Sequence, residues 1–488
     1  MNVAEIRENN LIQDKITPKK KFFHSFFHQS IILLITHYSL PKMFRILTSL
    51  LLSCLLFFSS CTPAWAFCGF YVAKADTNLY NQASQVIIAR DGNRTVLTMA
   101  NDYQGDVEDF AMVIPVPVLL EEGQVQVGDP TILARLDDFS APRLVEYFDE
   151  NPCNVVRYRR GEALESAVPS MADNQAVAEE DLGVTVESRF TVGEYDIVIL
   201  SAKESDGLET WLTQNNYNIP EGASSLLQPY IRQQMKFFVA KVNLGEYEAS
   251  DFQSLRPLMI AYESPKFMLP IRLGMINAQG DQDLIVYLLS PKGQIELTNY
   301  RTVKVPSDVE IPEFVEEEFA DFYKDMFQTS YEKERKQVAF LEYAWDMAWC
   351  DPCSAQPLNP EELRKAGVFW LDQGFGNPNL SRAPNSNVFI SRLHVRYNRE
   401  HFPEDLSFQE TSNRQQFQGR YVIRHPFRGE ADCDAAREYK RNLAQRLDKE
   451  AQTLARLTRW DIDEIRSKIE MPEVAEQPWW RNFFNWVF

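Results

Sequence analysis

Short apolar runs, separated by turn residues, fill residues 67–310 of this chain. Two β-branched runs, Ser84 to Ala89 and Thr95 to Ala100, flank Asp91-Gly92, a dipeptide that is typical of a tight hairpin turn. A third run, Phe110 to Val118, carries two prolines, which cannot donate the hydrogen bonds of a central strand. We therefore expect a β hairpin, with the third run at a sheet edge or forming an irregular strand end.

Residues 183–305 combine further strands with two helices. Apolar or alternating runs predict strands at Val184 to Phe190, Tyr195 to Ser201, Met235 to Val242, Leu258 to Tyr262, Phe267 to Leu273, Leu284 to Leu289 and Gln294 to Tyr300. Helical spacing predicts helices at Asp206 to Asn216 and Ser224 to Gln234, and Ser140 to Phe148 has the pattern of a capped helical turn. Because the helices do not alternate regularly with strands, the order favours an α+β fold.

The later part of the chain adds longer helical patterns. Residues 311–349 carry apolar side chains at steps of three and four, including Val338, Leu341, Trp345 and Ala348, which predicts helix up to Pro352. Asn359 is a suitable cap for the next helix. Strand signals return over residues 386–427, and residues 434–470 predict one long helix. The whole pattern predicts a β-rich body of mostly antiparallel strands with helical additions and a long C-terminal helix.

Changes in composition divide the chain into six predicted stretches. They are a leader over residues 1–66, a β-rich subdomain over 67–160, a mobile acidic linker over 161–182, an α+β subdomain over 183–310, a helical and strand segment containing a Cys-x-x-Cys over 311–433, and a helix with an aromatic tail over 434–488. The linker is rich in Ala, Glu, Ser and Asp and has no large aromatic residue, which is typical of a solvated segment.

The leader has the three parts of a secretory signal peptide. A basic start at Met43-Phe44-Arg45 precedes an apolar run from Ile46 to Phe58, and Ala64-Trp65-Ala66 supplies small residues for cleavage after Ala66. A retained membrane anchor and a lipid-anchored Cys61 are the alternatives. We expect an exported protein that begins at Met43 and is periplasmic or extracellular, with membrane association as an alternative.

The net charge argues against nucleic-acid partners. The chain has 50 Lys and Arg against 69 Asp and Glu, a formal charge of −19. Residues 1–66 contain seven basic and three acidic residues, so the rest of the chain carries −23. Such a chain repels phosphate backbones and anionic lipid surfaces. It also lacks a phosphate-binding loop, a dinucleotide fingerprint and a nucleophile elbow, so we expect no cofactor and consider an enzyme less favoured.

Five cysteines follow the leader and are the disulfide candidates: Cys68, Cys153, Cys350, Cys353 and Cys433. In an oxidising compartment most of them should pair, and an odd number leaves one over. Spacing does not fix the pairs. Cys350–Cys353 with Cys68–Cys153 is one arrangement, in which Cys433 is free. The alternative pairs Cys433 with Cys350 or Cys353.

The pair Cys350 and Cys353 is also the redox candidate of the chain. Trp349-Cys350-Asp351-Pro352-Cys353 resembles the active-site string of thioredoxin-like proteins, which place it after a buried strand and at a helix start. Here the predicted helix would instead place Cys350 at a helix C-terminus, whose negative end disfavours a thiolate. Asp346 and Asp351 act in the same direction. We therefore favour a structural disulfide over redox activity, and redox activity over half of a metal site.

Three histidines follow the leader, His394, His401 and His425. Together with Cys433 they form a conceivable metal cluster. Their spacings match no common zinc pattern, and His394 falls within a predicted strand, so we expect no metal site.

The aromatic tail offers two interpretations. Its large side chains are Trp479, Trp480, Phe483, Phe484 and Trp486. They can dock into a groove of the protein body, or they can lie in a bilayer headgroup zone as a peripheral membrane contact. We favour docking, because Arg481 is the only cation available to engage acidic lipid.

Several strings together resemble one bacterial family. They are Cys68-Gly69-Phe70-Tyr71-Val72-Ala73-Lys74-Ala75, Asn101-Asp102-Tyr103-Gln104-Gly105-Asp106, Ile114-Pro115-Val116-Pro117, Ser140-Ala141-Pro142-Arg143 and Trp349-Cys350-Asp351-Pro352-Cys353. This set is similar to exported bacterial proteins grouped as domain of unknown function 2330, over most of residues 67–430. The resemblance implies export and one family-wide domain, and it implies no particular activity.

Two functional hypotheses remain from the sequence. The first is a non-catalytic exported protein with a binding or envelope-associated structural role, possibly with an envelope protein as partner. The second is a thiol–disulfide oxidoreductase that uses Cys350 and Cys353.

Overall fold

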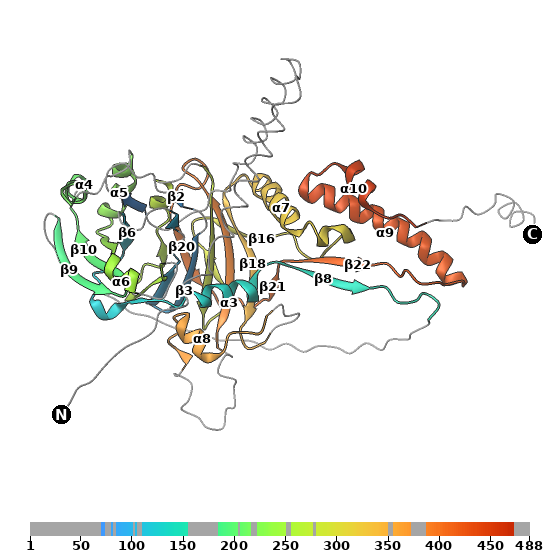
Figure 1. The fold of residues 1–488 in the computed structure, drawn as a ribbon, viewed down its shortest axis with the longest axis horizontal. Helices are drawn as coiled ribbons and strands as arrows, with labels where there is room; N and C mark the ends of the chain where they lie inside the picture. Colours follow the sequence, from blue (N-terminus) through green and yellow to red (C-terminus); the bar gives the residue numbers. More distant parts are fainter. Residues whose placement is uncertain are drawn as a thin grey trace, which may run out of the picture. The chain divides into compact units, whose positions relative to one another are not determined.

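The fold was analysed in a computed structural model. It describes residues 70–73, 80–81, 84–100, 103–104, 110–154, 184–203, 205–215, 222–249, 255–276, 280–349, 355–371 and 387–472. All of these belong to one unit, Ala64–Phe488. The leader, the acidic linker, Cys68, Cys350, Cys353 and the aromatic tail lie outside the described residues. The fold is α+β, as predicted (Figure 1).

The largest sheet has nine strands. Its order is β16 (Arg301–Lys304), β18 (Val338–Asp346), β19 (Phe389–Tyr397), β14 (Gln282–Ser290), β3 (Ser84–Asp91), β4 (Arg94–Met99), β12 (Leu258–Glu263) and β7 (Val125–Val127), and β21 (Phe417–Gln418) also pairs with β18. The predicted hairpin is confirmed, since Asp91 pairs with Arg94 around Gly92 and Asn93. Gly92 has φ +57°, a left-handed conformation that glycine adopts without steric cost.

A five-stranded antiparallel sheet packs on the first. Its order is β1 (Phe70–Ala73), β6 (Phe110–Val116), β11 (Lys236–Val242), β10 (Tyr195–Ser201) and β9 (Thr185–Val192). Of the two positions predicted for this run, the sheet edge is wrong, because β6 pairs on both sides, whereas its prolines do lie at the strand end, with Pro117 beyond its last residue. Its proline is tolerated because β1 reaches only as far as Val113, so Pro115 has a partner strand on one side alone, Phe237 of β11.

Helices cover the outer faces of these two sheets. Along β3, Val86 and Ile88 belong to the apolar cluster shared by the two sheets, whereas Ile87 and Ala89 belong to the cluster formed with the helices α3 and α8. The other face of the five-stranded sheet packs against α4 and α5. The helix bounds are α3 Thr131–Ser140, α8 Pro360–Lys365, α4 Ser205–Gln214 and α5 Ala223–Arg232. The result is a four-layer arrangement of helices, sheet, sheet and helices.

A smaller module contains the C-terminal elements. Three parallel strands, β17 (Val309–Ile311), β22 (Arg420–His425) and β8 (Arg143–Phe148), form its sheet. The 3-10 helix η4 (Glu313–Glu316) and the helices α7 (Phe319–Lys333), α9 (Asp434–Thr458) and α10 (Ile462–Lys468) belong to the same module. Their apolar side chains share one core with Tyr421 and Ile423 of β22. The helical turn predicted for Ser140 to Phe148 is wrong, since most of it is strand β8.

The remaining described elements are short. They are β2 (Tyr80–Asn81), β5 (Tyr103–Gln104), η2 (Glu122–Gln124), α6 (Leu244–Ala249), β13 (Met268–Leu269), η3 (Arg272–Met275), β15 (Ile295–Leu297) and β20 (Leu406–Glu410). Only Met268 and Leu269 of the strand predicted for Phe267 to Leu273 are strand. Among the helices in the described ranges, none has the length and apolar character needed to cross a membrane.

Two helix predictions need correction. The helix predicted over residues 338–348 is wrong, because Val338–Asp346 is a strand within the nine-stranded sheet. Eight consecutive side chains of this strand are buried, and a strand covered on both faces has an apolar run that resembles a helix pattern. The long C-terminal helix is confirmed, but it ends at Thr458, because Arg459 adopts φ 64° and α10 begins separately.

Candidate functional site

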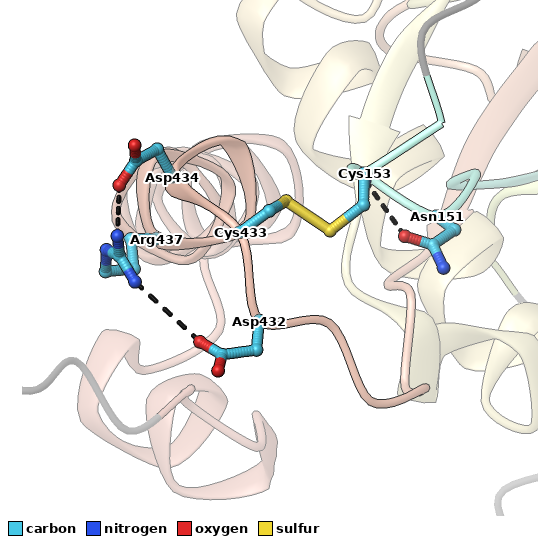
Figure 2. Close-up of a disulfide and its surroundings, with 6 residues drawn as sticks. All are labelled: Asn151, Cys153, Asp432, Cys433, Asp434 and Arg437. Carbon is cyan, nitrogen blue, oxygen red and sulfur yellow. Dashed lines mark hydrogen bonds and ion pairs between the residues drawn. A yellow bond between two sulfur atoms is a disulfide. The ribbon is translucent and has the colours of Figure 1, made fainter.

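One disulfide links distant parts of the chain. Cys153 and Cys433 are bonded, with a separation of 280 positions in sequence and 6.1 Å between their Cα atoms (Figure 2). Cys153 lies in the turn after β8, where its amide donates to the Asn151 side chain, and Cys433 is the residue before α9. Two of the five candidates are therefore paired. The pairings considered from the sequence, Cys68 bonded to Cys153 and Cys433 bonded to Cys350 or Cys353, are therefore wrong.

The surroundings of the Cys-x-x-Cys differ from those predicted. The motif follows strand β18, whose end at Asp346 is succeeded by a turn and the half-exposed Trp349. The helix predicted to precede Cys350 is therefore wrong, and Cys350 itself lies outside the described residues. The next helix begins at Pro360, and Asn359 caps it as predicted, accepting hydrogen bonds from the amides of Glu361 and Glu362.

His394 lies in a buried cluster of charges between β18, β19 and β14. Its Nδ1 is 2.8 Å from Glu342 Oε1, and its Nε2 is 3.2 Å from Asp283 Oδ1. Arg392 donates to the other oxygen of Glu342 at 2.6 Å, and Arg396 makes two hydrogen bonds of 2.7 Å to Asp283. Because Glu342 is 1% exposed, its hydrogen bonds come from these side chains rather than from water.

The cluster pairs acidic with basic side chains. Its carboxylates are Asp283, Glu342 and the partly exposed Asp137, and their basic partners are Arg392, Arg396 and His394. Burial acts to raise the pKa of Glu342, but the charges of Arg392 and His394 outweigh it and lower that pKa to about 2. Burial acts to lower the pKa of His394, and Glu342 and Asp283 outweigh it and raise that pKa. The Phe327 ring stacks on the imidazole, with 3.9 Å between the ring centroids. Because Asp283, Glu342 and His394 lie on three neighbouring strands, the cluster holds β14, β18 and β19 together, and we call it an internal brace of the sheet.

His425 lies in a similar but open cluster at the end of β22. Its Nδ1 is 2.9 Å from Glu313 Oε1, and its Nε2 is 3.2 Å from Glu146 Oε2. Phe148 stacks on the ring at 4.4 Å. Glu146 and Glu316 are exposed, and one oxygen of each lies within 4.8 Å of the other and of a His425 ring nitrogen.

The cluster of all three histidines with Cys433, which the sequence analysis considered and did not favour, is not formed, because Cys433 is in a disulfide and offers no thiolate. His401 instead contacts Asn398. Sequence analysis missed the glutamates around His425, and no local signal identifies them, since Glu146 lies 279 residues from His425.

A groove of about 800 Å³ adjoins the His425 cluster. It is lined by η4, by Pro426 to Arg428 and by residues of α9 and α10. Its walls combine apolar side chains, such as Phe314 and Leu447, with charged ones, such as Glu316 and Lys468. A groove with this mixture is suited to a peptide segment or a protein surface rather than to a small apolar molecule.

A second cavity of about 440 Å³ is lined by Arg424 of β22 and by Lys449 and Glu450 of α9, among other residues. Glu450 is 3% exposed, and its Oε1 makes no hydrogen bond within the described part of the chain, although Arg446 Nε lies 3.3 Å away. Burial raises the pKa of Glu450 to about 7.

The fold and these clusters define a disulfide-bonded α+β protein whose C-terminal module is attached to a four-layer body. A family model described as "Uncharacterized protein conserved in bacteria (DUF2330)" matches residues 62–409, and the chain belongs to this family. The match ends within β20, so β21, β22, α9 and α10 lie beyond it. No curated protein matches the chain, and no solved structure does.

Proposed function

We propose that the protein is exported and serves a non-catalytic role in binding or structure at the cell envelope, in the periplasm or outside the cell. The observation that carries the proposal is the Cys153–Cys433 disulfide, because such bonds form and persist in oxidising compartments. The apolar run before Ala64-Trp65-Ala66 supports the same address.

The charge clusters support a role without catalysis. The ionisable groups around His394 are buried and satisfied by one another, which suits a structural brace better than proton transfer to a substrate. The groove beside η4 supports a binding role, with an envelope protein as the partner. The partner would contact both apolar and charged walls of this groove.

Cell fractionation combined with thiol trapping tests the proposal. We expect the protein in the envelope or extracellular fraction, beginning at Phe67, with Cys153 and Cys433 protected from alkylation until a reductant is added. A matched chain that lacks residues 1–66 should stay in the cytosol with both thiols free. Native protein found in the cytosol with its leader intact and its thiols reduced would refute the proposal.

The thiol–disulfide oxidoreductase remains a second candidate because of one observation. Strand β18 is buried and directly precedes Trp349-Cys350-Asp351-Pro352-Cys353, which is half of the context that thioredoxin-like proteins use. The other half, a helix that begins at the motif, would fall on residues outside the described part of the chain. A redox titration of Cys350 and Cys353, with C350S as the control in a thiol-exchange assay, separates the two functions. Exchange activity that C350S abolishes would favour the oxidoreductase.

A further inference from the structure

The topology of the C-terminal module gathers ligand-forming side chains around His425. Strand β22 is central in the parallel sheet, so its last residue lies between β8 on one side and the end of β17 on the other. Glu146 comes from β8, and Glu313 and Glu316 come from η4, which follows β17. Glutamates from two other segments, β8 and η4, therefore surround the His425 imidazole of β22.

We propose that Glu146, Glu316 and His425 bind one divalent transition-metal ion. The distance between His425 Nε2 and Glu146 Oε2 is 3.2 Å. With bonds of about 2.0 to 2.2 Å, two ligand atoms of a tetrahedral zinc ion lie about 3.3 Å apart, so this pair already has the spacing of neighbouring ligands. Glu316 is exposed, and one of its carboxylate oxygens lies within 4.8 Å of a His425 ring nitrogen and of a Glu146 oxygen, so a change of its side-chain rotamer would bring it to the same ion.

Glu313 acts as a positioning residue for the imidazole. Its Oε1 lies 2.9 Å from His425 Nδ1. When Nδ1 carries the proton, Glu313 accepts a hydrogen bond from it, and the unprotonated Nε2 faces Glu146. A carboxylate that orients a metal-binding histidine in this way is a regular feature of metal sites. The Phe148 ring, stacked at 4.4 Å, holds the imidazole plane from one side.

The local charge fits a divalent ion. Glu146, Glu313 and Glu316 bring three negative charges, and Arg428, 3.0 Å from Glu313, returns one positive charge. An ion of charge two with a neutral imidazole balances the remainder. One imidazole with two carboxylates suits Zn²⁺, Mn²⁺, Fe²⁺ or Co²⁺, whereas Ca²⁺ and Mg²⁺ prefer sites built from oxygen alone.

Calorimetric titration of purified protein without a histidine tag tests the site, with Zn²⁺ as the probe and Ca²⁺ as the comparison. We expect one saturable zinc site, with at least tenfold weaker binding in H425A, E146Q and E316Q. E313Q should weaken zinc binding about 10- to 100-fold, the usual effect of removing an orienting carboxylate. E317Q removes a neighbouring charge that lines the same groove, and it should bind zinc like the wild type.

Two further controls keep the result specific. The same titration in a C350S/C353S background excludes zinc held by the Cys-x-x-Cys, and there the site should persist. Metal-free unfolding curves show whether each variant is folded, which matters least for E146Q and E316Q because both side chains are exposed. Zinc binding that H425A leaves unchanged, or no saturable site in the wild type, would overturn the proposal.

Discussion

Two histidines in different regions of the molecule have almost the same first neighbours. His394 in the four-layer body and His425 in the C-terminal module each face two carboxylates, at 2.8 and 3.2 Å in the first case and at 2.9 and 3.2 Å in the second. A phenylalanine ring stacks on each imidazole, Phe327 on one and Phe148 on the other.

The two clusters differ in what surrounds the carboxylates. Around His394, Arg392 and Arg396 satisfy Glu342 and Asp283, and this set is largely buried, so we call it the closed cluster. Around His425 the acids are partly exposed, and a third carboxylate, Glu316, lies nearby. The same histidine motif is therefore a fixed brace where arginines complete it, and an accessible donor set where they do not. Neighbouring charges and burial, rather than the histidine itself, decide between these roles.

The largest effect should come from breaking the closed cluster. E342Q removes the charge that Arg392 and His394 share, and loss of one partner from a buried ion pair costs about 3–5 kcal/mol of unfolding free energy. Urea unfolding at pH 7 measures this loss.

The pH dependence of that loss follows from the lowered pKa of Glu342. Its stabilisation is complete above the unfolded value near 4.5 and disappears as the pH falls toward about 2. The difference between E342Q and wild type should therefore shrink at pH 3. A loss below about 1 kcal/mol at pH 7 would mean that the cluster is not a brace.

Much of the body follows from local sequence signals. The hairpin between β3 and β4 has its turn residues in place, and the capping box of α8 involves only Asn359 and its next three residues. The strand β18 was mistaken for helix because a strand that is buried on both faces loses the two-residue alternation. Burial on two faces depends on the neighbouring layers, which the local pattern does not contain.

The candidate site was not predictable from spacing. Glu342 lies 52 residues from His394, and Glu146 lies 279 residues from His425. The parallel pairing of β8 with β22 creates the second of these contacts, and the disulfide joins residues 280 apart. Long-range pairing of this kind is decided by the packing of the whole chain, so the histidines were visible in the sequence and their partners were not.

The second-largest effect concerns the attachment of the C-terminal module. A C153S/C433S chain loses a bond that closes a very long loop, and such a loss destabilises a protein by about 2–4 kcal/mol. We expect hydrogen exchange to rise in β8, β22 and α9 and to stay nearly constant in β14 and β19. C350S is the matched single-thiol control. Equal loss of protection in both regions would show that the module is not a separate cooperative part.

A third test compares two buried carboxyl groups. Glu342 has partners that lower its pKa, whereas burial raises the pKa of Glu450 to about 7. Between the unfolded value near 4.5 and about 7 the folded state holds a proton that the unfolded state releases, so stability falls as the pH rises through this range.

E450Q removes the ionised form and should stabilise the protein at pH 8, on the order of 2 kcal/mol. At pH 4 it should change little. Thermal unfolding across this pH range provides the measurement, and Glu438, a further acidic residue of α9 that is exposed, offers the matched control E438Q. Destabilisation by E450Q at pH 8 would show that the contact with Arg446 is stronger than the cost of burial.

The smallest effect should come from the open cluster, measured in metal-free buffer. E146Q removes one partner of His425, but this ion pair is partly exposed, and exposed pairs contribute less than about 1 kcal/mol. Salt should reduce the effect further, because mobile ions screen charges that water reaches. The buried effect of E342Q should survive the same salt. E146Q could instead reduce the unfolding free energy as much as E342Q does, with no dependence on salt. The two clusters would then be equivalent braces, and the distinction between a buried and an accessible histidine would be wrong.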